Sequence, residues 1–397
     1  MQFSEVIGQK ELKAKLVKMI EANRLSHALL FLEKEGAGGL ALARAFAQYI
    51  VCENVNKQNT GDSLFGDSLP VLQPEDSCGK CASCIKAAAM IHPDIHFSFP
   101  VIPKKSDRPS VSADFMAEFR QYMLANPYSN EYNWLQFINA ENKQGNITSR
   151  ECEEIIRIMG LKSFESEYKI LIMWMPEALG NEGNKLLKLI EEPPPNTLFI
   201  FVARSEELII PTILSRVQLV KVPPLEREEI KNALIKRENA TEQQATEISG
   251  IAGGNYFEAL QLFNHVEENH IGQLKVWLNS ILKTGNLSQV KVIDELAKMG
   301  RERQKQFLRY FIHLIEHAIR MRALGMEAVA DSGNAELNDF AAKFNKFATI
   351  EQQEAITNEL DKSIYYIERN ANAKILFHAL TIRLYHIFTH KVVILVN

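Results

Sequence analysis

The sequence has no long apolar run, and this absence excludes a membrane span. Its longest runs, residues 170–175 and 198–203, have the length of a strand and fall far short of the roughly 20 residues that a spanning helix needs. The first fifteen residues also lack the basic stretch and apolar segment of a secretory signal. We therefore expect a cytoplasmic protein without a membrane partner.

An excess of basic residues is absent as well. The 45 lysines and arginines and 49 aspartates and glutamates leave a net charge of −4, whereas a free-standing nucleic-acid-binding protein usually carries a positive excess. Hydrophobic residues make up 46% of the chain, a composition typical of a globular protein. Because 397 residues are too many for one ordinary core, we expect two or three domains.

The spacing of apolar residues divides the chain into an α/β part and a helical part. Strand-like residues 27–32, 169–175 and 197–203 are accompanied by helical segments such as residues 40–51. Short apolar strands separated by helices are typical of a parallel sheet that is covered on both faces. The strand signals stop after Pro223, so we expect only helical domains beyond it.

Two stretches fit this plan poorly. Residues 53–77 are polar and contain glycines, and residues 97–146 mix prolines with aromatic residues without a steady period. Loops of this length inside a compact domain are usually functional or disordered. We expect both stretches to be surface insertions, and the sequence does not indicate their role.

The segment after the first expected strand lacks the chemistry of a phosphate-binding loop. Such a loop needs glycines, a lysine for the β- and γ-phosphates and a Ser or Thr hydroxyl for the metal ion. Three glycines are present: Gly36, Gly38 and Gly39. However, Glu33 occupies the first glycine position, Gly39 the lysine position and Leu40 the hydroxyl position. A carboxylate repels a triphosphate, and Lys34 does not project from the helix start, so we expect no ATP hydrolysis by this chain.

Three segments resemble bacterial clamp-loader AAA+ subunits and follow one another in that family's order. They are residues 24–31 (RLSHALLF), 185–194 (KLLKLIEEPP) and 211–217 (PTILSRV). The similarity covers about the first 220 residues, and residues 370–374 (NANAK) near the end are similar to a turn of the family's collar domain.

This resemblance implies a three-domain organisation. A degenerate AAA+ ATPase-like domain would span residues 1–222, with a metal module near residues 52–84. A small helical lid domain would follow over residues 223–268. An all-helical collar, through which such subunits oligomerise, would occupy residues 269–397.

Further elements of nucleotide chemistry are missing by comparison with the family's catalytic subunits. Residues 173–174 (MW) or, with a small register shift, 175–177 (MPE) stand where an Asp-Glu pair is expected. Arg204 follows the strand at which a polar sensor is expected, and residues 255–260 lack the lid arginine. Since these losses occur together, the resemblance is to a delta-prime-type subunit. Nucleotide binding without hydrolysis remains an open alternative.

Ser215 and Arg216 are retained where the family places its arginine finger. A guanidinium is planar, always charged and bidentate toward phosphate, so it can stabilise charge on a neighbour's γ-phosphate. By itself a Ser-Arg pair carries no information, and many arginines form only surface ion pairs. In the TILSR context the resemblance implies that Arg216 acts in trans as a catalytic residue, with Ser215 supporting the turn.

A run of three cysteines at CxxCxxC spacing indicates a metal site. Cys78, Cys81 and Cys84 form the run, and Cys52 follows the preceding helical segment. Four thiolates complete a tetrahedral structural zinc site. The 25 residues between Cys52 and Cys78 leave His92 as an alternative fourth ligand. An iron–sulfur cluster also accepts four cysteines, but nothing else in the sequence indicates redox chemistry.

The resemblance implies a subunit of the DNA polymerase III clamp loader without its own ATPase activity. Its partners would be gamma/tau-type ATPase subunits and a delta subunit in a hetero-pentamer, the sliding clamp, and primed DNA through the assembled complex. One alternative, an active clamp-loader ATPase subunit, requires the missing lysine. A second is a zinc-containing DNA-binding scaffold on a degenerate AAA+ fold. Its basic surface would consist of Lys80, Lys86, Lys104 and Lys105.

Overall fold

The computed structural model divides the chain into two compact units. It describes residues 1–59, 75–104, 109–140, 143–264, 270–283, 286–324, 335–369 and 371–390. The first unit comprises residues 1–233 and 254–257, and the second comprises residues 234–253 and 258–397. Within the described ranges, no helix is both long and apolar enough to cross a membrane.

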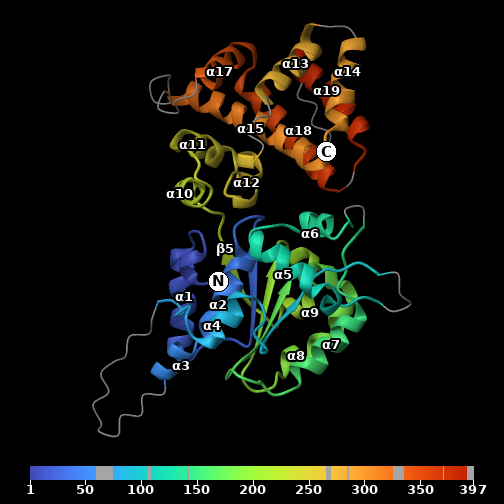
Figure 1. Cartoon of the computed structure of the whole chain (residues 1–397). Coiled ribbons are helices and arrows are strands. Elements are labelled where there is room, and N and C mark those ends of the chain that lie inside the picture. Colours follow the sequence, from blue (N-terminus) through green and yellow to red (C-terminus); the bar gives the residue numbers. More distant parts are fainter. Residues whose placement is uncertain are drawn as a thin grey trace. The chain divides into compact units, whose positions relative to one another are not determined.

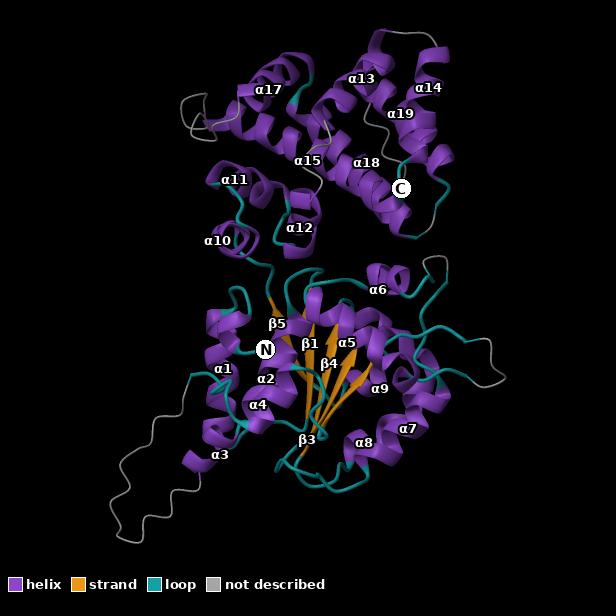
Figure 2. Cartoon of the chain, viewed as in Figure 1, coloured by secondary structure: helices purple, strands orange, loops and turns teal. Residues whose placement is uncertain are grey.

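A five-stranded parallel sheet forms the centre of the first unit (Figure 2). In chain order its strands are β1 (Ala28–Glu33), β2 (Ile95–Ser98), β3 (Lys169–Trp174), β4 (Thr197–Ala203) and β5 (Gln218–Val222). The order across the sheet is β2-β3-β4-β1-β5, so β1 is flanked by β4 and β5. Ligands of open parallel sheets bind beyond the carboxyl ends of the strands. The loop that follows β1 lies at this end of the sheet.

Helices cover both faces of this sheet. Helix α2 (Gly39–Val51) is buried along its whole length and packs on β1, β3 and β4. It is mostly apolar, and its two polar side chains, Arg44 and Gln48, are buried as well. The opposite face is covered by α7 (Ser149–Met159), η3 (Pro176–Leu186), α8 (Leu187–Glu191) and α9 (Pro211–Leu214), which share a core with the strands. The predicted parallel sheet with flanking helices is confirmed.

Shorter helices complete the first unit around these layers (Figure 1). They are η1 (Phe3–Glu5), α1 (Lys10–Glu21), α3 (Glu53–Asn59), α4 (Ala82–Ala88), η2 (Ser112–Phe115), α5 (Met116–Ala125), α6 (Glu131–Phe137) and η4 (Glu206–Leu208). The short strands β2 and β5 were not expected from the sequence. Residues 60–74 of the first expected insertion lie outside the described residues.

The described residues of the second expected insertion, 97–104, 109–140 and 143–146, are folded within the first unit. Phe99 and Phe119 stack with ring centroids 3.7 Å apart, and Trp134 meets both rings edge-on at 5.4 and 5.2 Å. All three rings are fully buried, and Trp134 Nε1 donates a hydrogen bond of 2.9 Å to the carbonyl of Pro100. The description of residues 97–146 as a surface insertion is therefore wrong for these residues. Ring–ring packing requires no regular period, so the sequence pattern did not reveal it.

Beyond β5, every regular element in the described ranges is a helix, as predicted (Figure 1). The helices are α10 (Arg227–Glu238), α11 (Glu242–Ile251), α12 (Tyr256–Asn264), α13 (His270–Lys283), α14 (Asn286–Lys298), α15 (Arg301–Leu324), α17 (Ala335–Phe347), α18 (Ile350–Glu368) and α19 (Ala373–His390). Trp277, Phe307, Phe311 and Phe377 are fully buried in the core of the second unit. The division into a lid at 223–268 and a collar at 269–397 stays a prediction.

The aromatic cluster gives the first testable prediction. Trp134→Ala removes a fully buried ring and its hydrogen bond, so we expect a loss of about 3–5 kcal/mol in the free energy of unfolding of the first unit. Phe164→Ala in the same unit is the control, because Phe164 is 81% exposed and its loss should cost less than about 1 kcal/mol. Denaturant unfolding followed by circular dichroism measures both. Equal losses would show that the cluster does not support the unit.

Candidate functional site

The loop between β1 and α2 is covered by the chain's own side chains. Residues 36–40 are all buried. Gly38 adopts a φ of 92° at the N-cap of α2, a left-handed conformation that glycine accepts without strain. A phosphate-binding loop must present its backbone amides to the ligand. Here the Gly39 amide donates to the Glu33 carboxyl group and the Ala37 amide to the carbonyl of Lys34.

Glu33 ends β1 and contacts the start of α2. The backbone N–H of Gly39 donates a hydrogen bond of 2.5 Å to its Oε2 atom. A Cβ atom built on Gly39 would lie 2.7 Å from Cδ of Glu33, so the lysine position of the motif also has no room for a side chain. Burial raises the pKa of Glu33 to about 7, against the opposing effects of the Gly39 amide and Arg204.

The other degenerate positions of the nucleotide site are joined to the same loop. Arg204, at the sensor position, donates from Nη1 to Oε2 of Glu35 at 3.1 Å. The backbone N–H groups of Arg204 and Ser205 donate to Oε1 of Glu177 at 2.6 and 3.0 Å. Met173 and Trp174 are buried in β3, where they pack in the core. The polar groups at this sheet edge therefore pair with one another.

Arg216 lies directly after α9 and is held at the surface by three groups. Its guanidinium donates to the carboxylate of Glu191 in α8, to the carbonyl of Thr212 at 2.7 Å and to Oγ of Ser215 at 3.0 Å. The Arg216 side chain keeps 33% of its surface exposed. The arginine is thus oriented but accessible, unlike the loop at residues 36–40.

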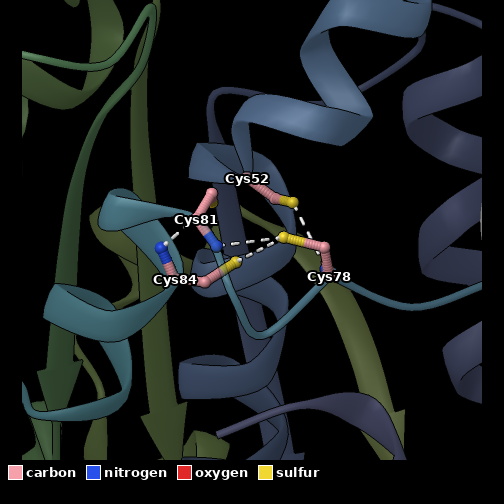
Figure 3. A group of neighbouring side chains, drawn as sticks. All are labelled: Cys52, Cys78, Cys81 and Cys84. Carbon is pink, nitrogen blue, oxygen red and sulfur yellow. Dashed lines mark hydrogen bonds between the residues drawn. The ribbon is translucent and has the colours of Figure 1, made fainter.

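The four predicted cysteines come together in space. Cys52 ends α2, Cys84 lies in α4, and Cys78 and Cys81 lie in the turn before that helix. Figure 3 shows their side chains turned toward one another, and their sulfur atoms all lie within 4.8 Å of one another. This group could hold a metal ion. His92 is not among the described residues grouped here, and its Nδ1 instead accepts a hydrogen bond from the Asp94 amide at 3.1 Å.

Backbone amides surround the sulfur atoms. The N–H groups of Cys78, Cys81 and Cys84 donate to the sulfur atoms of Cys52, Cys78 and Cys81 at 3.4, 3.3 and 3.4 Å. A hydrogen bond from the Cys84 thiol, together with amide donors, lowers the pKa of Cys52, while the same contact raises the pKa of Cys84. Donors of this kind stabilise thiolate, which is the form of cysteine that binds metals.

The basic residues considered for DNA binding are partly engaged within the first unit. Lys86 forms an ion pair with Glu165, with Nζ and Oε1 2.5 Å apart. Lys104 donates to the carbonyl of Asp114 and lies 4.2 Å from the ring centroid of Phe115. Lys105 lies outside the described residues. These contacts do not favour the basic surface that the DNA-binding alternative requires.

Sequence analysis missed two residues of the insertion that reach the degenerate loop. The hydroxyl of Tyr128 accepts a hydrogen bond of 2.7 Å from the Ile7 amide, and its ring lies against Gly38. Asn130 donates from Nδ2 to Oε1 of Glu35 at 2.7 Å. No motif marks either residue, because their role arises from contacts between segments about 95 residues or more apart in the sequence.

Together these features define a class of protein: an α/β unit with the strand–loop–helix geometry of a nucleotide site, but without the side chains of nucleotide chemistry. Comparison with known proteins specifies it further. The family described as "DNA polymerase III, delta subunit" matches residues 8–226, which is more than half of the chain. The chain belongs to this family, and the predicted resemblance to delta-prime-type clamp-loader subunits is confirmed.

Individual relatives agree with this assignment at low sequence identity. The DNA polymerase III subunit delta' of Bacillus subtilis is 26% identical over 234 residues, covering 57% of this chain and 53% of that protein. The delta' subunit of Haemophilus influenzae is 27% identical over 254 residues, covering 64% and 58%. The gamma/tau subunit of Mycobacterium tuberculosis is 26% identical over 215 residues, covering 54% and 27%. The matches thus span about half the length of the delta' relatives and about a quarter of the gamma/tau relative.

The raised pKa of Glu33 predicts a pH-dependent contribution to stability. Its folded-state value of about 7 lies above the ordinary value of 4.5, so the protonated form is favoured by folding. This contribution is fully present below about pH 4.5 and is lost as the pH rises through 7.

In wild type, the free energy of unfolding should fall by on the order of 1–3 kcal/mol between about pH 4.5 and pH 7 because Glu33 ionises. Glu33→Gln cannot ionise, so we expect this fall to be absent in the variant. Urea unfolding across this pH range, with the exposed Glu11→Gln in α1 as the control, measures the effect. Parallel stability profiles for Glu33→Gln and wild type would contradict the assigned shift.

Proposed function

We propose that this chain is the delta-prime-type subunit of the DNA polymerase III clamp loader and that Arg216 completes the ATP site of a neighbouring ATPase subunit. One observation carries the proposal: the chain's own phosphate loop is buried, while an oriented arginine in the TILSR segment remains accessible. Family membership supplies the context for the arginine. The chain itself would have no ATPase activity.

The contacts of Arg216 suit a finger that acts in trans. The Thr212 carbonyl and the Ser215 hydroxyl orient the guanidinium, and an oriented guanidinium loses little freedom when it binds a phosphate. Its pair with Glu191 is partly solvent-exposed, at 33% and 44% of the two side chains, and surface pairs contribute little stability. A neighbour's γ-phosphate can therefore replace the Glu191 carboxylate at small cost. Ser215 supports the turn and adds no charge of its own.

The cysteine group is proposed to bind a structural zinc ion. Four sulfurs placed about 2.3 Å from one zinc ion lie roughly 3.8 Å apart in a tetrahedron, which the separations of at most 4.8 Å approach closely. A cluster of several irons is larger than one ion and needs more widely spaced sulfurs. With all four positions filled by protein, zinc would support folding and not catalysis.

The assembly proposed for this chain follows from its family. The ATPase-like domain at 1–222, the lid at 223–268 and the collar at 269–397 would pack in a hetero-pentamer with gamma/tau-type ATPase subunits and a delta subunit. The complex would open the sliding clamp and place it on primed DNA. The net charge of −4 is consistent with DNA contact through the assembled complex and not through this chain alone.

Replacing the arginine tests its proposed role. In a loader reconstituted with its ATPase subunits, Arg216→Ala should lower DNA- and clamp-stimulated ATP turnover by at least ~10-fold, because an arginine finger stabilises phosphoryl-transfer charge. Arg157→Ala in α7 is the matched control, since that arginine is exposed and pairs only locally with Glu154. Gel filtration confirms assembly. Unchanged ATP turnover in an intact Arg216→Ala complex would show that Arg216 does not act as an arginine finger.

Metal analysis tests the zinc site. We expect about one zinc ion per chain in the purified protein, and its loss in Cys84→Ser together with a fall in Tm of at least about 4 °C. Cys152→Ser is the control, because Cys152 is buried outside the group of four. Elemental analysis and thermal unfolding provide the readouts. Full zinc content in Cys84→Ser would exclude this set of ligands, and an iron content would identify a different metal centre.

A further inference from the structure

The part of the insertion that contains Tyr128 and Asn130 lies against the degenerate phosphate loop. Tyr128 is buried, and a Cβ atom built on Gly38 would lie 2.5 Å from Cε1 of its ring. The insertion is anchored nearby, because the buried guanidinium of Arg44 in α2 donates to the carbonyl of Met123 in α5 at 3.0 Å. Asn130 adds its hydrogen bond to Glu35. The loop is therefore covered by protein at Gly38 and Glu35.

A second segment of the first unit closes the loop next to Tyr128. The backbone N–H of Tyr256 donates to the carbonyl of Gly36 at 3.2 Å, and the Asn255 side chain lies against Gly36. The rings of Tyr256 and Tyr128 meet edge-on with centroids 5.1 Å apart. Asn255 stands in the segment where the catalytic relatives were expected to carry a nucleotide-binding arginine. Here that segment contacts the loop directly.

We infer that Glu33 fills the phosphate position at the start of α2 as a built-in carboxyl ligand, and that Tyr128 seals it in, so that neither nucleotide nor free phosphate binds this loop. Three observations support this: the Gly39 amide donates to Glu33, the loop residues are buried, and the insertion packs over Gly38. The inference depends on this loop alone and not on the role of Arg216.

The physical basis is competition for one set of donors. The start of a helix offers unpaired N–H groups and a partial positive charge, which favour a carboxylate or a phosphate. A ligand from solution loses translational and rotational freedom on binding, whereas Glu33 is already attached to the adjacent strand. A phosphate would also have to displace the Glu33 carboxylate and the Tyr128 ring. Attached and covered, Glu33 excludes it.

This inference differs from simple loss of the motif lysine. Loss of the lysine and hydroxyl alone would leave glycine amides free to bind phosphate groups weakly. In the filled and covered loop the Gly39 amide already donates to Glu33, and the Ala37 amide donates to the carbonyl of Lys34. It also assigns a role to the insertion, namely to keep the site closed whatever the concentration of nucleotide.

A rescue experiment on the full-length chain tests the inference. At about pH 8 and constant ionic strength, Glu33→Ala should open the phosphate position by removing the carboxyl group that fills it. Inorganic phosphate should then raise the Tm of Glu33→Ala saturably by about 2–4 °C. Glu33→Gln is the matched control, because its amide fills the same volume. The Tm values of Glu33→Gln and wild type should not respond to phosphate.

A measurement on wild type alone covers the case in which Glu33→Ala does not fold. In equilibrium dialysis, wild type should retain no ATP and no phosphate at ligand concentrations up to about 1 mM. Saturable binding to wild type, accompanied by slower hydrogen exchange in residues 36–44, would overturn the inference. A folded Glu33→Ala variant whose Tm does not rise with phosphate would also overturn the inference. Neither result would affect the ATP-turnover test of Arg216.

Discussion

The hydrogen bond from the Gly39 amide to the Glu33 carboxyl group joins the end of β1 to the start of α2, at the centre of the first unit. Helix α2 is buried along its whole length, so its first N–H groups cannot all turn to water. In a nucleotide-binding protein of this geometry the ligand's phosphates accept from such amides. Here a side chain of the preceding strand does so, and the chain needs no ligand to complete the packing of α2 against the sheet.

The other end of α2 is fixed by the cysteine group. Cys52 is the C-cap residue of the helix, and its sulfur lies with those of Cys78, Cys81 and Cys84. Both ends of the central helix are therefore held by side chains. At its start these are Glu33, which is near in sequence, and Tyr128, which is distant; at its end they are the cysteines. Arg216 is arranged in the opposite way, oriented by its own turn and open to solvent. The chain thus closes its own site and leaves exposed the group that would act elsewhere.

The sequence by itself determined the central strands and the helical second half. β1, β3 and β4 are buried on both faces, so they appear as continuous apolar runs, and β4 has the predicted bounds. β2 has only four residues, and β5 alternates between exposed and buried positions at the edge of the sheet, so neither produces such a run. The CxxCxxC spacing predicted three of the grouped cysteines as metal ligands. These three lie in a turn and the first residues of the following helix, so they are close in sequence as well as in space.

Only the tertiary structure decided what closes the site. The segments that bring Tyr128 and Asn130 to the loop pack through aromatic rings, which follow no helical or strand period. Cys52 and Cys78 are separated by 25 residues, and spacing of that length does not fix whether two sulfurs meet. The sequence determined that the phosphate loop lacks lysine and hydroxyl. That a carboxylate takes the place of the ligand depends on how β1, α2 and the insertion pack, since burial and hydrogen-bond partners are set by contacts across the whole unit.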